Sequence, residues 1–280
     1  METIQISTVA GQHLAADHWP GDQTPVLLAH GGGQTRHSWG GTAEKLASNG
    51  HRVVSIDLRG HGDSSWDAEG DYSMAAYCAD AQHVVEWIGE PVAWVGASLG
   101  GMTGLHAVDG APHSYTSLTL VDITPRPAKA GVTRILDFMA ARAHDGFASL
   151  DEAADAIAEY QPHRPRPADL TGLAKNLRHR DDGRWYWHWD PAFMTSRGQV
   201  NSEHARDRHH DDLEQMARRI TMPTLLIRGK LSDLVTEDEV QAFMEMVPHA
   251  EYVDVKGAAH MIAGDKNDLF TDAVVSFLDR

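Results

Sequence analysis

A short apolar run, a tight turn with one serine and a helix-compatible segment follow one another in the first half of the chain. Residues 91–95 (PVAWV) have the length and apolarity of a buried strand. Residues 96–100 read G-x-S-x-G, and residues 102–108 (MTGLHAV) can continue as a helix with small side chains. Glycines flank Ser98 because so tight a turn leaves no room for side chains. The pattern predicts a strained strand-to-helix turn that exposes the Ser98 hydroxyl.

Apolar runs of buried-strand type alternate with helical patterns along most of the chain. Besides residues 91–95, these runs occupy residues 25–29, 52–57, 117–123, 224–229 and 252–255. Helical patterns separate them, as in the segment that begins after Ser73, a residue type that caps helices. The alternation predicts an α/β fold with a doubly wound, mostly parallel sheet, in which residues 4–19 form an antiparallel edge hairpin.

The alternation stops between residues 125 and 220. This stretch is rich in Arg, Asp, His and Ala, contains no buried-strand run, and spaces its apolar residues as helices do. We therefore predict a core domain of residues 1–124 and 221–280, with residues 125–220 inserted as a helical cap, or lid. Such a cap would cover the carboxyl edge of the sheet, where doubly wound folds bind ligands.

Composition limits the partners and the compartment. The chain has 280 residues, of which 42% are hydrophobic and 23% charged, as in ordinary soluble domains. A net charge of −16 argues against nucleic acid or an anionic membrane as a partner. No signal-peptide pattern or membrane-length apolar stretch is present, and the one cysteine excludes an intrachain disulfide. We expect a cytoplasmic protein; the oligomeric state stays open.

Ser98 needs chemical partners if it is to act. A serine hydroxyl becomes a nucleophile at neutral pH when a histidine takes its proton and a carboxylate orients that histidine. With a G-x-S-x-G turn, the expected chain order is Ser, then Asp or Glu, then His. Asp233 and His260 each follow a late strand run, so both are expected at the sheet edge of Ser98. We predict that His260 is the base and Asp233 the orienting acid.

Acyl transfer also requires N–H donors aimed at the oxyanion of the tetrahedral intermediate. The backbone N–H of Leu99, one residue after the serine, is the first candidate. The second is expected after the strand run 25–29, in residues 30–33 (HGGG), where we choose Gly32. A phosphate-binding loop is the competing interpretation, but this loop lacks both the Gly-Lys-Ser/Thr ending and a G-x-G-x-x-G pattern.

Aromatic residues crowd into residues 185–189 (WYWHW), where they either line a substrate pocket or pack the cap against the core. The candidate pocket residues are Gly33, His37, Trp185, Trp187 and Met261. Residues 206–212 (RDRHHDD) suggest a metal site, but neighbouring histidines on a charged helix cannot both face one ion. We predict neither a metal nor a cofactor.

Five segments together resemble the α/β-hydrolase superfamily, namely residues 30–32, 57–64, 96–100, 229–233 and 257–260. The resemblance covers the chain outside the predicted cap, and its details are similar to esterase, lactonase and cofactor-free haloperoxidase-like members. Ser98 stands where epoxide hydrolases and haloalkane dehalogenases carry a nucleophilic aspartate, which argues against both activities. Some members place the acid after the sixth strand, which makes Asp122 the alternative acid. Met261 replaces the tryptophan usual in C–C-bond hydrolases.

These features predict a serine hydrolase that cleaves a small-molecule carboxylic ester or lactone through an acyl-enzyme. Two alternatives use the same fold, because membership of this superfamily does not determine the substrate. One is another reaction on the same triad, either C–C bond hydrolysis or perhydrolysis. The other is a non-catalytic small-molecule binding protein, which an intact triad disfavours. The natural substrate stays open.

Overall fold

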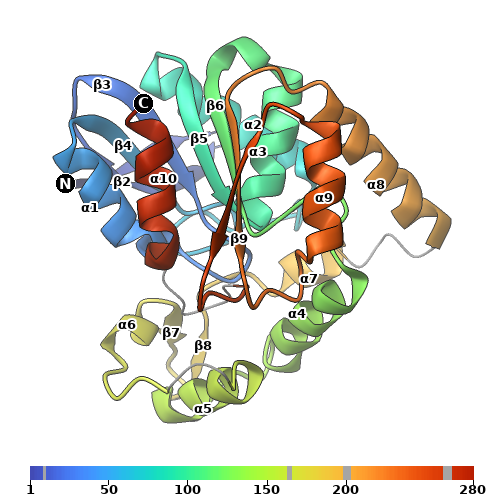
Figure 1. The fold of residues 1–280 in the computed structure, drawn as a ribbon. Helices are drawn as coiled ribbons and strands as arrows, with labels where there is room; N and C mark the ends of the chain where they lie inside the picture. The colour runs from blue at the N-terminus through green and yellow to red at the C-terminus, as the bar shows by residue number, and fades with distance from the viewer. Residues whose placement is uncertain (9–10, 163–165, 198–202, 261–266) are drawn as a thin grey trace.

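A computed structural model describes the fold of residues 1–8, 11–162, 166–197, 203–260 and 267–280 (Figure 1). An eight-stranded sheet has the order β1-β2-β4-β3-β5-β6-β9-β10. Its strands are β1 (Glu2–Ser7), β2 (His13–Trp19), β3 (Gln23–Ala29), β4 (His51–Ile56), β5 (Val92–Ala97), β6 (Tyr115–Val121), β9 (Thr224–Gly229) and β10 (Glu251–Val255).

The pairing confirms a mostly parallel sheet with an antiparallel edge. Strand β1 pairs with β2, and β2 with β4, in antiparallel fashion, whereas every pairing from β4 to β10 is parallel. Successive side chains of a strand point to opposite faces of the sheet, and both faces of the central strands are buried. In β3, Leu27 and Ala29 belong to one buried core, and Val26 and Leu28 to the other. This explains why β3 reads as a continuous apolar run.

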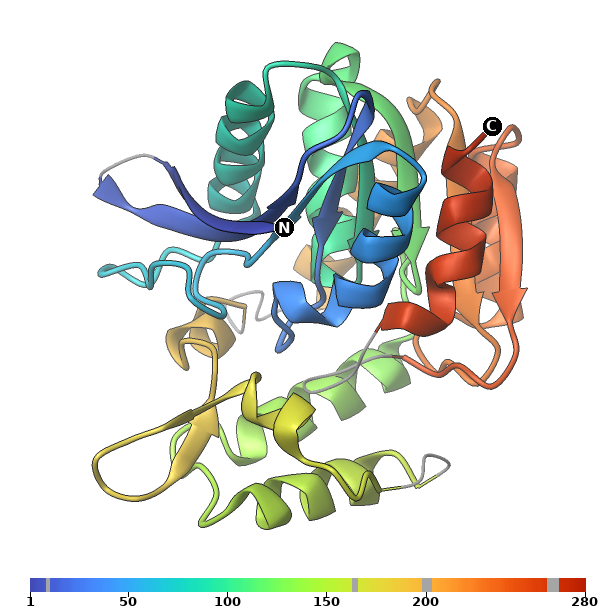
Figure 2. The ribbon, with the colours of Figure 1, turned by 90° about the vertical axis from the view of Figure 1, so that its left-hand side faces the viewer.

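Helices cover both faces of the sheet (Figure 2). On one face, α1 (Gly40–Ser48) packs against α10 (Thr271–Leu278). The other face carries α2 (Met74–Ile88), α3 (Leu99–Gly110), α8 (Glu203–Arg218) and α9 (Glu237–Met246). Short 3₁₀ turns are η2 (Arg36–Trp39), η3 (Pro112–Ser114) and η4 (Asn267–Phe270).

Local signals placed helix α2 correctly. Helix α2 begins after Ser73, whose side chain accepts a hydrogen bond from the Ala76 N–H, as the predicted N-cap should. It ends at Gly89, whose left-handed φ of 81° is easily adopted by a residue without Cβ. Among the described residues, none of the helices combines the length and the apolarity that crossing a membrane requires.

The segment between β6 and β9 differs in two ways from the predicted helical insertion. Most of it lies beyond the carboxyl ends of the strands, below the sheet in Figure 1, and comprises α4 (Lys129–Ala141), α5 (Leu150–Tyr160), α6 (Thr171–Ala174), β7 (Leu177–His179), β8 (Trp185–Trp187) and α7 (Ala192–Arg197). We call this part the cap. It contains a two-stranded hairpin, β7–β8, whose three-residue strands are too short to show an alternating pattern. Helix α8 instead packs against α3 and α9 of the sheet domain.

Candidate active site

Ser98 occupies the turn between β5 and α3 in a backbone conformation that few residues adopt. Its φ of 44° and ψ of −109° are costly for a residue with a Cβ. A Cβ added to Gly96 would collide with the backbone of Gly100, and one added to Gly100 would collide with the backbone of Ala29. Glycine is therefore required on both sides of the serine. The turn is the strained strand-to-helix connection that the sequence predicted.

His260 lies against Asp122 rather than against Asp233. The His260 Nδ1 atom is 2.7 Å from Oδ2 of Asp122, and both side chains are buried. Asp122 follows β6 directly and is, with Ser98, one of two described non-glycine residues with positive φ. The Ser98 N–H donates to the carbonyl of Val121, so the serine and the Asp122–His260 pair share one sheet edge.

The predicted contact between Asp233 and His260 is therefore wrong. The Asp233 carboxylate accepts a hydrogen bond of 2.8 Å from Arg134 of α4, and its side chain is 37% exposed. Asp122 directly follows β6, the strand next to β5, whereas Asp233 lies four residues beyond β9 and contacts the cap. Both positions satisfy the expected chain order, which cannot distinguish them.

Asp122 is held by three further hydrogen bonds to β9 and its loop, two through the carboxylate and one through the backbone. Its Oδ1 accepts the Gly229 N–H at 3.0 Å. Its Oδ2 accepts the Ser232 hydroxyl at 2.8 Å, in addition to the histidine. The Asp122 N–H donates to the carbonyl of Ile227 at 2.7 Å. The donors from Gly229, Ser232 and His260 compensate the cost of burying the carboxylate.

His30 organises the glycine-rich loop after β3. Its Nε2 accepts the Leu58 N–H at 3.0 Å, so its Nδ1 carries the proton and donates to the Gly31 carbonyl at 2.7 Å. Burial of this side chain lowers the pKa of His30 to about 4, which keeps the ring neutral near pH 7. The Gly31 N–H donates to Oε1 of Gln34, and a Cβ on Gly31 would lie 3.4 Å from Cβ of Ser98. The loop therefore lies beside the serine.

The two predicted oxyanion donors belong to elements that meet at Ser98. Leu99 is the first residue of α3, and the first N–H groups of a helix have no intrahelical acceptor. The Gly100 N–H donates to the His30 carbonyl at 3.1 Å, which ties this helix terminus to the glycine-rich loop. Gly32 faces the cap, since a Cβ there would lie 3.4 Å from the ring of Phe193.

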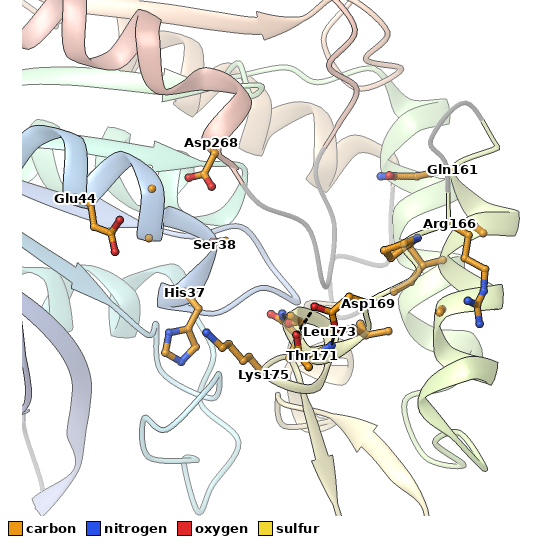
Figure 3. Close-up of a pocket in the computed structure, with 18 residues that line it drawn as sticks. His37, Ser38, Glu44, Gln161, Arg166, Asp169, Thr171, Leu173, Lys175 and Asp268 are labelled. Atoms are coloured by element: carbon orange, nitrogen blue, oxygen red, sulfur yellow. Dashed lines mark hydrogen bonds between the residues drawn. The ribbon is translucent and has the colours of Figure 1, made fainter.

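A cavity of about 670 Å³ separates the core from the cap (Figure 3). Its walls come from η2, α1 and η4 of the core and from α5, α6 and their flanking residues of the cap. They include His37, Ser38, Glu44, Gln161, Lys175 and Asp268. Gln161 joins this wall to the site because its Nε2 donates to the His260 carbonyl at 3.0 Å. Ser98 and His260 themselves are not among the lining residues of this cavity.

The predicted pocket residues separate into three groups. His37 lines the cavity, whereas Gly33, Trp185 and Trp187 are not among its lining residues. Trp187 is buried against the rings of Phe147 and Phe138, at centroid distances of 5.0 and 6.0 Å. This favours the packing role that the sequence left open for the aromatic segment. The third group is Met261, which lies outside the described residues.

Two other reactive-looking groups have structural explanations. Burial raises the pKa of the Cys78 thiol to about 11, so it is protonated and a poor nucleophile. Beside the histidine pair of α8, Asp211 and Glu214 accept hydrogen bonds from Arg126 at 2.6 and 2.7 Å. Within the part of the chain that the structure describes, no three His, Cys, Asp or Glu side chains are arranged to hold a metal ion.

Sequence reasoning missed three polar side chains of this site: Gln34, Gln161 and Ser232. Gln161 contacts a partner 99 positions away in the chain, and Ser232 one 110 positions away. Gln34 binds Gly31 locally, but its Nε2 also lies 3.3 Å from Oδ1 of Asn267. Ser232 lies in a segment that resembles the superfamily, yet nothing in its spacing indicates which carboxylate it binds.

The fold and the site define the class of this protein. A family model described as the alpha/beta hydrolase fold matches residues 24–266, and the chain belongs to this family. It is 28% identical over 281 residues to the esterase Rv0045c of Mycobacterium tuberculosis, covering 98% of this chain and 89% of that protein. The crystal structure of that esterase matches with a TM-score of 0.73 at 26% identity, covering 100% of this chain and 91% of the other.

Other relatives extend the comparison. The chain is 28% identical over 269 residues to a 3-hydroxybutyrate-oligomer hydrolase of Cupriavidus necator, covering 92% of this chain and 90% of that protein. The structure of E-2-(acetamidomethylene)succinate hydrolase matches with a TM-score of 0.81 at 21% identity and covers 100% of both chains. At that identity, the likeness concerns the fold alone.

Proposed function

We propose that this protein is a serine hydrolase that cleaves a carboxylic ester of a small molecule, either open-chain or a lactone, through an acyl-enzyme. The observation that carries the proposal is the buried hydrogen bond between His260 and Asp122 at the sheet edge of the strained Ser98 turn. The similarity to the M. tuberculosis esterase over nearly the whole chain supports ester chemistry.

Acylation begins with the transfer of the Ser98 hydroxyl proton to His260. Because Asp122 engages Nδ1, Nε2 is the ring nitrogen that takes this proton. The Ser98 oxygen then forms a bond to the ester carbonyl carbon, whose oxygen becomes the oxyanion. The Leu99 and Gly32 N–H groups stabilise this charge. Collapse breaks the bond to the alcohol oxygen, which leaves with the proton from His260.

Deacylation repeats these steps with water. His260 takes a proton from water, the hydroxide oxygen attacks the acyl carbon, and the bond to Ser98 breaks. The serine recovers its proton from His260, and the carboxylic acid leaves. Asp122 keeps its negative charge throughout and stabilises the imidazolium that forms in each half-reaction.

Covalent labelling and substrate hydrolysis test this function together. A fluorophosphonate should add to Ser98, as measured by intact mass and peptide mapping. A p-nitrophenyl ester series from acetate to long acyl chains, with a lactone panel, should identify the substrate class. Ser98→Ala should abolish labelling and lower kcat by about 10⁴-fold or more. Ser48→Ala, on the exposed end of α1, is the matched control.

The outcomes separate the hypotheses. Turnover that peaks at one chain length would indicate a carboxylesterase, and lactone opening without ester turnover would indicate a lactonase. Labelling of Ser98 without turnover of esters or lactones would indicate that the triad is reactive and catalyses another reaction. Absence of both labelling and turnover would contradict the proposed hydrolase and favour a binding protein.

A further inference from the structure

We infer that Ser232 is a positioning residue that holds the Asp122 carboxylate in the orientation needed to align His260. This inference rests on the proposed function, because it assigns Asp122 to the orienting role. Ser232 lies in the loop after β9, in the superfamily-like segment in which the sequence pointed to the neighbouring Asp233 instead. Its side chain is buried, with 8% of the residue exposed.

The hydrogen bonds of Ser232 determine where its proton points. The Leu234 and Val235 N–H groups donate to its Oγ at 3.1 and 3.2 Å. A hydroxyl has one proton and two acceptor lone pairs, and these two donors occupy the acceptor capacity. The proton is therefore directed to Oδ2 of Asp122 at 2.8 Å.

The same carboxylate oxygen serves both Ser232 and His260. Oδ2 of Asp122 lies 2.8 Å from the serine Oγ and 2.7 Å from the histidine Nδ1. The Gly229 N–H holds only the other oxygen, Oδ1. Because the terminal torsion of an aspartate has a broad energy well, one anchor leaves the carboxylate free to rotate. Ser232 supplies the second anchor, on the oxygen that contacts the histidine.

This arrangement gives Ser232 a role beyond loop geometry. A serine that only shaped the turn would need its Oγ as an acceptor for the Leu234 and Val235 N–H groups, and its own N–H bond to the Gly229 carbonyl at 2.8 Å. None of these bonds uses the hydroxyl proton. In this structure the Ser232 hydroxyl proton is donated to Asp122, the acid of the proposed triad. A displacement of a catalytic group by about 1 Å can lower the rate by about 10²-fold.

The test measures how fast a fluorophosphonate labels Ser98, with kcat and KM for a p-nitrophenyl ester, in Ser232→Ala and Ser232→Thr. Ser232→Ala should slow labelling and lower kcat by about 10- to 100-fold while KM changes by less than about twofold. Ser232→Thr retains the hydroxyl and should restore both rates to within about threefold of wild type. The downfield proton resonance of His260 Nδ1–H should move upfield only in the alanine variant.

Thr236→Ala is the matched control from the same loop. Thr236 caps α9 through a capping box with Glu239 and has no contact with Asp122 among those described. This variant should melt at a lower temperature with an unchanged labelling rate. If Ser232→Ala does not fold, Ser232→Cys retains the volume and only a weak donor, and the same rate loss is expected.

Three results would overturn the inference. They are an unchanged labelling rate in Ser232→Ala, a loss that threonine does not rescue, and an equal loss in Thr236→Ala. Failure of the proposed function is a different result, since wild type itself would then resist both labelling and turnover. In that case the Nδ1–H resonance still tests whether Ser232 orders the Asp122–His260 pair, and an unmoved resonance in Ser232→Ala would contradict it.

Discussion

His260 and Asp122 meet through a 2.7 Å hydrogen bond between side chains that lie 138 positions apart in the chain. The carboxylate comes from the end of β6 and the histidine from the loop after β10, with β9 between these strands in the sheet. Asp122 reaches this position through a left-handed backbone with φ of 52°. An aspartate tolerates this conformation better than most residues because its short side chain can bond locally.

Asp122→Asn and Asp233→Asn should differ sharply in activity. The amide at position 122 would favour the wrong tautomer of His260, so kcat should fall by about 10⁴-fold with little change in KM. Asp233→Asn removes only a half-exposed ion pair with Arg134, and kcat should stay within about threefold of wild type. Steady-state kinetics on one activated ester measures both variants. Equal losses would contradict the assignment of the acid to Asp122.

His30 should make the protein less stable as the pH falls. Its folded pKa of about 4 lies below the ordinary histidine value of 6.5, so the unfolded chain binds the proton more readily. The stabilisation is present above pH 6.5 and is lost as the pH falls toward 4. His30→Gln should therefore reduce the loss of unfolding free energy between pH 7 and pH 4.5 by about 2–3 kcal/mol. Urea titrations at both pH values measure this difference. An equal loss of unfolding free energy in wild type and His30→Gln would contradict the prediction.

Gly100→Ala should destabilise the Ser98 turn. The added methyl group would collide with the backbone of Ala29. This backbone cannot shift away, because it belongs to a strand in the centre of the sheet. We expect a loss of about 3 kcal/mol or more in the free energy of unfolding, together with slower labelling of Ser98. Gly110→Ala, at the end of the same helix, places its methyl group in open space and should be neutral or stabilising by up to about 1 kcal/mol. Chemical denaturation compares the pair, and similar effects would argue against the steric explanation.

Gln161→Leu should reveal how the cap supports the site. The substitution removes the donor to the buried His260 carbonyl, and we expect a loss of about 1–3 kcal/mol in unfolding free energy. Labelling of Ser98 should slow because the His260 loop loses its contact with the cap. Glu159→Gln changes an exposed side chain in the last turn of α5, two residues before Gln161, and is the control. A Gln161→Leu protein with wild-type stability and labelling would show that this contact is dispensable.

Much of the architecture was readable from local patterns. Strand runs, the Ser73 cap and the glycines around Ser98 express steric and hydrogen-bonding preferences that act over a few residues. The sheet, its antiparallel edge and the strained serine turn were therefore predicted correctly. The β7–β8 hairpin was not, because its three-residue strands have no period of their own and depend on surrounding cap packing.

The sequence by itself determined the class of fold, the serine turn and a late histidine, since these depend on neighbours in the chain. Only the tertiary structure decided which of Asp122 and Asp233 contacts His260, and brought Ser232 and Gln161 to the site. Chain order allowed either acid, because Asp122 and Asp233 both follow Ser98 and precede His260. Each also follows a strand that ends at the same edge of the sheet. The choice depended on contacts between residues about 100 or more positions apart, which arise only when the strands assemble and the cap closes over them.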